Sequence, residues 1–284
     1  MTPELALPRF ATAVAPTAFD GERATAVIPP GWEQGRATFG GVVLGQALAA
    51  ARRALPRLDD PSRRQEAPSP PRPCLAIVAA FPAPLGAGEV ELHVRPLRHG
   101  RAVSSVHVEL RQGNDVGCLA LVTFGSRRPS AVEVPPPPRP SLPPPDEVPP
   151  LVPRGVGGPE FTRFLDYRLG FGAPPFSGEA VREIGGWCRF RAEPGPLGEE
   201  HVLALVDAWP SPAVSRLPTR APAASITWSI ELLPIEAEPP ASGWWLYHAE
   251  LEAAGDGYAH AAARLWSPAG RLAALSRQAV AIFG

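Results

Sequence analysis

The sequence predicts an α+β protein built from two similar halves, each an antiparallel sheet around one central helix. Three observations support this class: a pair of matching segments half a chain apart, one strongly apolar helical segment in each half, and alternating strand-like segments after each helix. A chain of 284 residues with 45% hydrophobic content is long enough to bury the cores of two such units.

The matching segments are residues 99–124 and 256–281. Each begins with a polar residue and a glycine, which precede a stretch of alternating polar and apolar residues. A second glycine then precedes a second such stretch. The glycine spacing is identical, since 113 − 100 and 270 − 257 are both 13, and the two copies are offset by 257 − 100 = 157 residues. This repetition indicates a duplicated unit. We therefore expect two pseudo-symmetric halves whose sheets join edge to edge.

In the first half, residues 24–28 are expected to form a strand and residues 39–52 a helix. Apolar residues on all sides of that helix predict that it is buried, and Gly41 and Gly45 give it a flat side for close backbone approach. The expected strands that follow are 75–81, 89–95, 102–111 and 117–124.

The second half repeats this order: a strand at 187–191, a helix at 199–208, then strands at 225–232, 244–251, 258–266 and 271–283. An antiparallel sheet wrapped around one hydrophobic helix is the hot-dog fold, so the predicted architecture is a double hot dog. Half of the residues in 129–150 are proline, which predicts a stiff extended connector. We place the N-terminal hot dog at 1–128, the linker at 129–155 and the C-terminal hot dog at 156–284.

Composition excludes several classes of function. All 27 basic residues are arginine, so Schiff-base and P-loop lysine chemistry are excluded. The net charge of −1 gives no attraction to nucleic acid, and no apolar run is long enough to span a membrane. The widely spaced Cys74, Cys118 and Cys188 form no zinc pattern and fit a reducing cytoplasm. The bias toward arginine, alanine and proline is typical of a GC-rich bacterial genome.

Chemistry must come from scattered polar residues, because the common nucleophile, dinucleotide, phosphate and zinc motifs do not occur. Asp207 lies in the second apolar helix, where a carboxylate is costly to bury; the alternative is that it points to water at the helix end. Ser225 and Thr227 alternate on one expected strand face, which also suits a solvent-facing stripe. Gln278 lies in a strand of small residues where the repeat partner is Leu121, although a lone strand glutamine is more often on the surface.

Several motifs, in their order and spacing, resemble those of the type-II acyl-CoA thioesterases, which are double hot-dog enzymes. The resemblance covers nearly the whole chain and is carried by residues 39–48, 97–101, 164–168, 186–189, the Asp207 helix, 244–246 and 270–278. The family uses an aspartate, a hydroxyl residue and a glutamine around a water, and these fall on Asp207, Ser225 and Gln278. It often has Asp-His after the hydroxyl residue and glutamate after the glutamine; here the residues are Thr227, Trp228 and Ala279.

The resemblance implies hydrolysis of acyl-CoA to free acid and CoA without a covalent intermediate, as in fatty acid metabolism, and needs no cofactor or metal. Asp207, Ser225 and Gln278 are then the expected catalytic residues. Phe39, Gly40, Gly41 and Thr227 are the expected substrate-binding residues, with the glycine N–H groups as candidate oxyanion donors.

Two other functions remain open: an acyl-CoA or lipid-binding protein that has lost the water site, and a hot-dog enoyl-CoA hydratase. The hydratase reading needs a histidine five residues after the aspartate, where this chain has Pro212. Several large aromatic residues could shorten an acyl tunnel or simply fill the core; they are Phe39, Phe81, Trp187, Trp209 and Trp228. A dimer of double hot dogs is the expected assembly.

Overall fold

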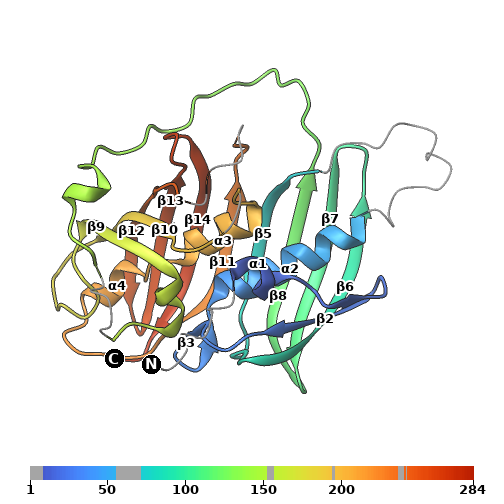
Figure 1. Ribbon diagram of the computed structural model, residues 1–284, viewed down its shortest axis with the longest axis horizontal. Helices are drawn as coiled ribbons and strands as arrows, with labels where there is room; N and C mark the ends of the chain where they lie inside the picture. The colour runs from blue at the N-terminus through green and yellow to red at the C-terminus, as the bar shows by residue number, and fades with distance from the viewer. Residues whose placement is uncertain (1–8, 56–71, 152–156, 194–195, 236–239, 241) are drawn as a thin grey trace.

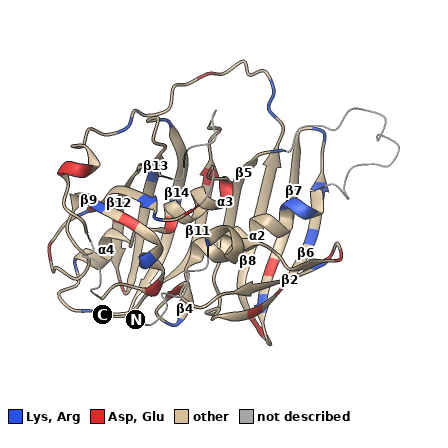
Figure 2. Cartoon of the chain, viewed as in Figure 1, with Lys and Arg blue, Asp and Glu red and all other residues tan. Residues whose placement is uncertain are grey.

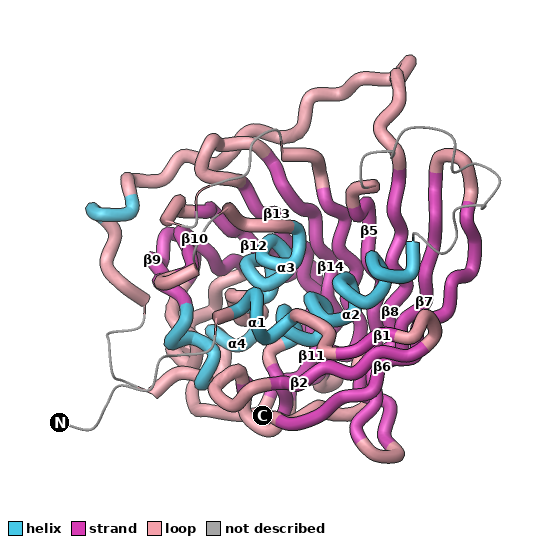
Figure 3. Tube along the Cα trace, turned by 45° about the vertical axis from the view of Figure 1, so that its right-hand side comes forward, coloured by secondary structure: helices cyan, strands magenta, loops and turns pink. Residues whose placement is uncertain are grey.

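One continuous antiparallel sheet forms the frame of the molecule, with its helices gathered on one face (Figures 1 and 3). The computed structural model describes residues 9–55, 72–151, 157–193, 196–235, 240 and 242–284. The first half contributes α1 (Phe10–Val14), β1 (Ala18–Phe19), β2 (Arg23–Ile28), α2 (Gly40–Ala54), β5 (Cys74–Ala80), β6 (Gly88–His99), β7 (Val103–Gln112) and β8 (Asp115–Gly125). A small two-stranded sheet is formed by β3 (Glu33–Gln34) and β4 (Ala37–Thr38).

The second half contributes the remaining strands of the sheet. They are β9 (Leu165–Gly172), β10 (Glu183–Phe190), β11 (Ala223–Leu232), β12 (Trp245–Gly255), β13 (Tyr258–Trp266) and β14 (Leu272–Ile282). Its helices are α3 (Glu199–Asp207) and the short α4 (Pro212–Ser215), with single 3₁₀ turns at Pro145–Glu147 and Glu160–Phe164. All predicted helices and strands are found. The structure also contains elements that were not predicted, namely α1, α4, β1, β3, β4 and β9.

The strand order is palindromic: β1-β2-β6-β7-β8-β5 is followed by β11-β14-β13-β12-β10-β9. The two halves meet where β5 pairs with β11, with Ala79 opposite Trp228 and Ile77 opposite Ile230. The predicted edge-to-edge joining of two related sheets is therefore confirmed. The segments of the repeat, β7–β8 and β13–β14, occupy equivalent positions on either side of this junction.

The repeat does not preserve side-chain facing along its whole length. Val108 and Leu265, offset by 157, are both fully buried under the helices. Leu121 and Gln278 have the same offset, but Leu121 is 38% exposed on the opposite face of the sheet. Val108 pairs with Ala120, but Leu265 pairs with Ala274 rather than with Arg277, which is 157 residues after Ala120. The longer β13–β14 turn thus shifts the register by three residues, and an odd shift reverses the facing. The prediction that Leu121 is the counterpart of Gln278 is wrong.

Helices α2 and α3 lie side by side and antiparallel on the inner face of the sheet, by which we mean the face they cover (Figure 3). A Cβ atom at Gly41 would lie 2.7 Å from the Cα of Ala204 in α3, so only glycine allows this approach. Gly45 is also needed, but its neighbour is the Val14 side chain of α1 rather than a backbone. As predicted, α2 is buried nearly all round; its basic residues lie at its C-terminal end (Figure 2).

An ion pair joins the C-terminal end of α2 to the N-terminal end of α3. Arg52, near the C-terminus of α2, pairs with Glu199 at the N-terminus of α3. Each charge lies at the helix end whose dipole favours it. The Glu199 carboxylate also accepts from the backbone N–H of Cys74 at 3.0 Å, which ties both helices to the first residue of β5.

The proline-rich segment after β8 runs extended, as predicted, but it is docked rather than free. Trp187 Nε1 donates to the carbonyl of Pro143 at 2.9 Å, and Trp266 Nε1 donates to that of Pro137 at 3.2 Å. Leu142 and Val148 cover a small apolar cluster on the outer face of the second half, which includes both tryptophans. Trp187 therefore lies on the opposite side of the sheet from α3 and cannot limit an acyl tunnel there.

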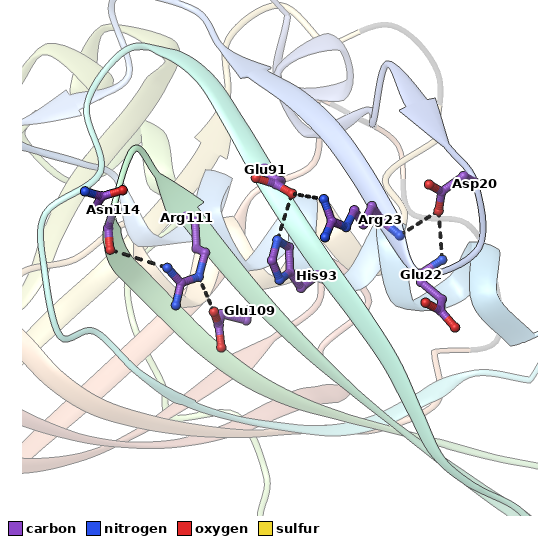
Figure 4. A network of polar contacts seen from close by, with 8 residues as sticks. All are labelled: Asp20, Glu22, Arg23, Glu91, His93, Glu109, Arg111 and Asn114. Carbon is purple, nitrogen blue, oxygen red and sulfur yellow. Dashed lines mark hydrogen bonds and ion pairs between the residues drawn. The ribbon is translucent and has the colours of Figure 1, made fainter.

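The outer face of the first half carries charged side chains instead. Glu91 on β6 contacts both Arg23 and His93, and Glu109 pairs with Arg111 on β7 (Figure 4). These exposed pairs mark the solvated side of the sheet. Among the described residues, no helix is long and apolar enough to cross a membrane.

Candidate active site

Asp207 is the last residue of α3 and reaches the first turn of α2. Its Oδ2 atom accepts a hydrogen bond of 2.9 Å from the backbone N–H of Gly41. A Cβ atom at Gly40 would lie 2.8 Å from the same oxygen, so a side chain there would displace the carboxylate. The alternative that Asp207 points away into water is therefore wrong.

Two opposing effects set the acidity of Asp207. Burial raises the pKa of its carboxyl group from 3.8 to about 7, although the N–H groups of Gly41 and Gly40 lower it. The positive end of the α2 dipole acts in the same direction as these two hydrogen bonds. A carboxyl group with a pKa close to neutral can accept a proton during turnover and release it again.

Ser225 and Gln278 form the second polar group of the site. Gln278 Nε2 donates to Ser225 Oγ at 2.7 Å between the neighbouring strands β14 and β11. Gln278 lies directly opposite Trp228, which is 2% exposed and faces the helices. Both side chains of the Ser225–Gln278 pair are therefore on the inner face, which is also the side of α3.

A β-bulge in β11 separates Ser225 from Thr227. The register shifts between these two residues, so Ser225 pairs with Val280 and Thr227 with Ala279. Thr227 is exposed and lines a shallow groove on the outer face with Val78 and Leu121. The extra residue in the strand reverses the expected facing. The prediction that Ser225 and Thr227 share a face is wrong, and Thr227 lies apart from Asp207.

The structure brings the predicted catalytic residues to one side of the sheet in two separate contacts. Asp207 is held by α2, and Ser225 is held by Gln278. Within the described part of the chain, no hydrogen bond joins Asp207 to either of the other two. Helix α3 packs against β13 and β14, which places the end of α3 on the half of the sheet that carries Gln278.

The predicted substrate-binding residues at the start of α2 have different surroundings. Phe39 is fully buried and stacks on Phe161 with ring centroids 4.1 Å apart, so it belongs to the core. The N–H of Gly41 is already bonded to Asp207. Gly40 and Gly41 thus contact the Asp207 carboxylate. This geometry does not support the oxyanion role that was expected for them from the sequence.

Three aromatic residues near Asp207 complete the inner wall. The rings of Tyr167 and Trp209 meet edge to face at 5.4 Å, and Trp209 stacks on Tyr247 at 6.1 Å. Burial raises the pKa of Tyr167 well above its ordinary range, and the Cys188 and Asp207 charges add to this. Tyr167 and Tyr247 were missed from sequence because only the pairing of β9, β10 and β12 shows that they face inward. No group of three metal-ligating side chains occurs among the described residues.

This fold and this pair of polar contacts define a double hot-dog protein. A family model of the acyl-CoA thioesterase N-terminal domain matches residues 28–125, and one of the C-terminal domain matches residues 140–282. The chain therefore belongs to the acyl-CoA thioesterase family, and it is a thioesterase.

Solved structures show the same fold at low sequence identity. A hot-dog protein of unknown function from Alicyclobacillus acidocaldarius has a TM-score of 0.79 and 22% identity, over 98% of this chain and 99% of that one. A putative thioesterase II from Thermobifida fusca has a TM-score of 0.76 and 20% identity, over 98% and 99% of the two chains. An acyl-CoA thioesterase II from Mycobacterium marinum has a TM-score of 0.72 and 18% identity, over 97% and 98%. No curated protein sequence matches the chain significantly.

Proposed function

We propose that the chain hydrolyses acyl-CoA by direct attack of water on the thioester carbonyl, with Asp207 as the general base. Asp207 takes a proton from the water as its oxygen bonds to the carbonyl carbon. The C–S bond then breaks, the thiolate of CoA takes this proton from Asp207, and the free acid leaves. The observation that carries this proposal is the Asp207 carboxyl group, held on Gly41 at 2.9 Å with a pKa of about 7.

Ser225 and Gln278 are proposed to position the water. Because Gln278 Nε2 donates to Ser225 Oγ, the serine O–H remains a donor and the Gln278 carbonyl oxygen remains an acceptor. A water molecule needs both kinds of partner to be held in one orientation. Such orientation lowers the barrier by bringing the attacking oxygen and the carbonyl carbon into reacting geometry.

The first turn of α2 is proposed to orient the base. Its N–H groups favour the ionised carboxylate, while the missing side chains of Gly40 and Gly41 leave room for it. The two halves are therefore proposed to act together, with the base from the unit at 156–284 and its support from the unit at 1–128, connected by the linker 129–155. One active site per chain follows. A dimer of such chains stays a prediction.

Turnover of a panel of short, medium, long and aromatic acyl-CoAs tests the proposal. Asp207→Asn should lower kcat by about 10²-fold or more, the usual contribution of a general base, with little change in KM. Asp256→Asn is the matched control, since Asp256 lies in the exposed β12–β13 turn with a φ of 52° that asparagine also tolerates. Tight binding of acyl-CoA without any turnover by the wild type would instead support the non-catalytic binding function.

A further inference from the structure

Trp209 anchors the C-terminal end of α3 to the edge of the sheet. It follows Asp207 by two residues and is 4% exposed. Its ring stacks on Tyr247 of β12 at 6.1 Å with an interplanar angle of 1°, and it meets Tyr167 of β9 edge to face at 5.4 Å. Its indole N–H donates to the Cys188 thiol of β10. One side chain thus contacts three neighbouring strands of the sheet.

The contacts of Trp209 complement the contact that Asp207 makes with the first half. The Asp207 carboxylate reaches α2 and accepts from Gly41 at 2.9 Å, while Trp209 holds the chain that follows it against the strands. Helix α3 has only nine residues, and Asp207 is the last of them. Helix ends fray unless tertiary contacts hold them. The direction in which Asp207 points therefore depends on how Trp209 is seated.

The same aromatic rings surround the Asp207 carboxyl group with apolar surface. Burial raises the pKa of Tyr167 and of Tyr247, and the charges of Cys188 and Asp207 raise both further, so the carboxylate lies near the two rings that Trp209 contacts. Burial is also the largest cause of the raised pKa of Asp207. A smaller side chain at position 209 would leave space beside the carboxylate, and space next to a polar group takes up water.

We propose that Trp209 is a positioning residue for the hydrolysis, which holds Asp207 against the first turn of α2 and shields its carboxyl group from bulk water. This inference rests on the proposed function, in which Asp207 is the general base. In this role Trp209 acts through Asp207 and touches no reacting atom. A hydrated and loosely held carboxylate is a weaker base, because hydration returns its pKa toward the ordinary range, and it is also less well aligned.

Trp209→Leu tests the role, with Trp187→Leu as the matched control. Trp187 is 5% exposed and its indole N–H also donates a hydrogen bond, but it lies on the outer face of the sheet and donates to Pro143. Trp209→Leu should lower kcat by about tenfold or more and keep KM within about twofold of wild type. It should also move the midpoint of the kcat/KM pH profile down by about one pH unit or more.

Trp187→Leu should lower the Tm in the same way without moving this midpoint, because it opens a cavity on the other face. Trp209→Phe keeps an aromatic ring against Tyr247, so it should restore most of the wild-type kcat and the wild-type midpoint. A second variant, Tyr247→Leu, removes the ring on which Trp209 stacks and should move the midpoint in the same direction as Trp209→Leu. It serves as the test if Trp209→Leu does not fold.

An NMR titration separates this inference from the proposed function. In protein with isotope-labelled aspartate, the Asp207 signal is the one that is missing from Asp207→Asn, and it reports the carboxyl group whether or not the protein turns over acyl-CoA. A lower Asp207 midpoint in Trp209→Leu, in a wild type that hydrolyses nothing, would sink the proposed function and leave the shielding by Trp209 intact. An Asp207 midpoint that stays at the wild-type value in Trp209→Leu, or that moves equally in Trp187→Leu, overturns the inference.

Discussion

Asp207 and Gly41 lie 166 positions apart in the sequence, yet the carboxylate of the first accepts a 2.9 Å hydrogen bond from the backbone of the second. This contact joins the C-terminal end of α3 to the N-terminal end of α2. The Arg52–Glu199 ion pair joins the two opposite ends of the same helices. The antiparallel helix pair is thus fastened at both ends, by the Asp207 carboxylate at one end and by an ion pair at the other.

The first prediction concerns the pH dependence of turnover. Since Asp207 has a raised pKa of about 7 and must be ionised to accept a proton, kcat/KM should rise with pH up to about 7 and then level off. A pH series with a substrate that does not titrate in this range measures the midpoint. A profile that is flat between pH 5 and 8 would remove Asp207 as the base.

Asp207 should also reduce stability at high pH. Its folded pKa of about 7 is above its ordinary 3.8, so the folded state holds the proton more tightly and loses stability as pH rises from about 4 to 7. About three pKa units correspond to roughly 4 kcal/mol. Asp207→Asn carries no charge, so its Tm should exceed that of the wild type at pH 8 and match it near pH 4. If the difference in Tm between Asp207→Asn and the wild type were the same at both pH values, the raised pKa of Asp207 would be contradicted.

The bulge in β11 predicts unequal roles for two neighbouring hydroxyl groups. Ser225→Ala removes the partner of Gln278 and should lower kcat by about tenfold or more, since proton-transfer geometry depends on the held water. Thr227→Ala changes the outer face, and its kcat should stay within about twofold of wild type. The reverse order of effects would place Thr227, not Ser225, in the site.

Close packing of α2 on α3 predicts that one added methyl group at Gly41 destabilises the protein. Gly41→Ala would put a Cβ atom 2.7 Å from the Cα of Ala204, so overpacking should lower the free energy of unfolding by about 1–3 kcal/mol or more. Gly255→Ala is the control, because no atom lies within 4 Å of a Cβ there. Urea unfolding of both variants measures the difference. Equal stability would show that the helices can move apart freely.

The architecture could be predicted because its signals are local and repeated. The apolar helix at 40–54, the alternating strands and the spaced glycines each follow from side-chain period and turn chemistry. The finer geometry could not be predicted from the sequence. Whether Thr227 faces the helices depends on one extra residue in β11, and the facing of Leu121 depends on turn length. Neither has a distinct sequence pattern, because a bulge is decided by pairing with neighbouring strands.

The candidate base was accessible from sequence, but its support was not. A carboxylate in an apolar helix is unusual enough to single out Asp207. Its partner at Gly41 belongs to the other half of the chain, and only the antiparallel packing of the helices reveals it. The sequence offered Trp209 only as an aromatic residue that could shorten an acyl tunnel or fill the core, and it gave no sign that Tyr167 packs against Trp209 beside Asp207.

The pairing of β5 with β11 has a consequence for the independence of the two halves. Each of these strands would be an open edge in a separated half, with unpaired N–H and C=O groups available to any other strand. Separation would also take Gly41 away from Asp207. The duplicated chain therefore behaves as a permanently linked heterodimer, in which a backbone N–H of the first half holds the Asp207 carboxylate of the second.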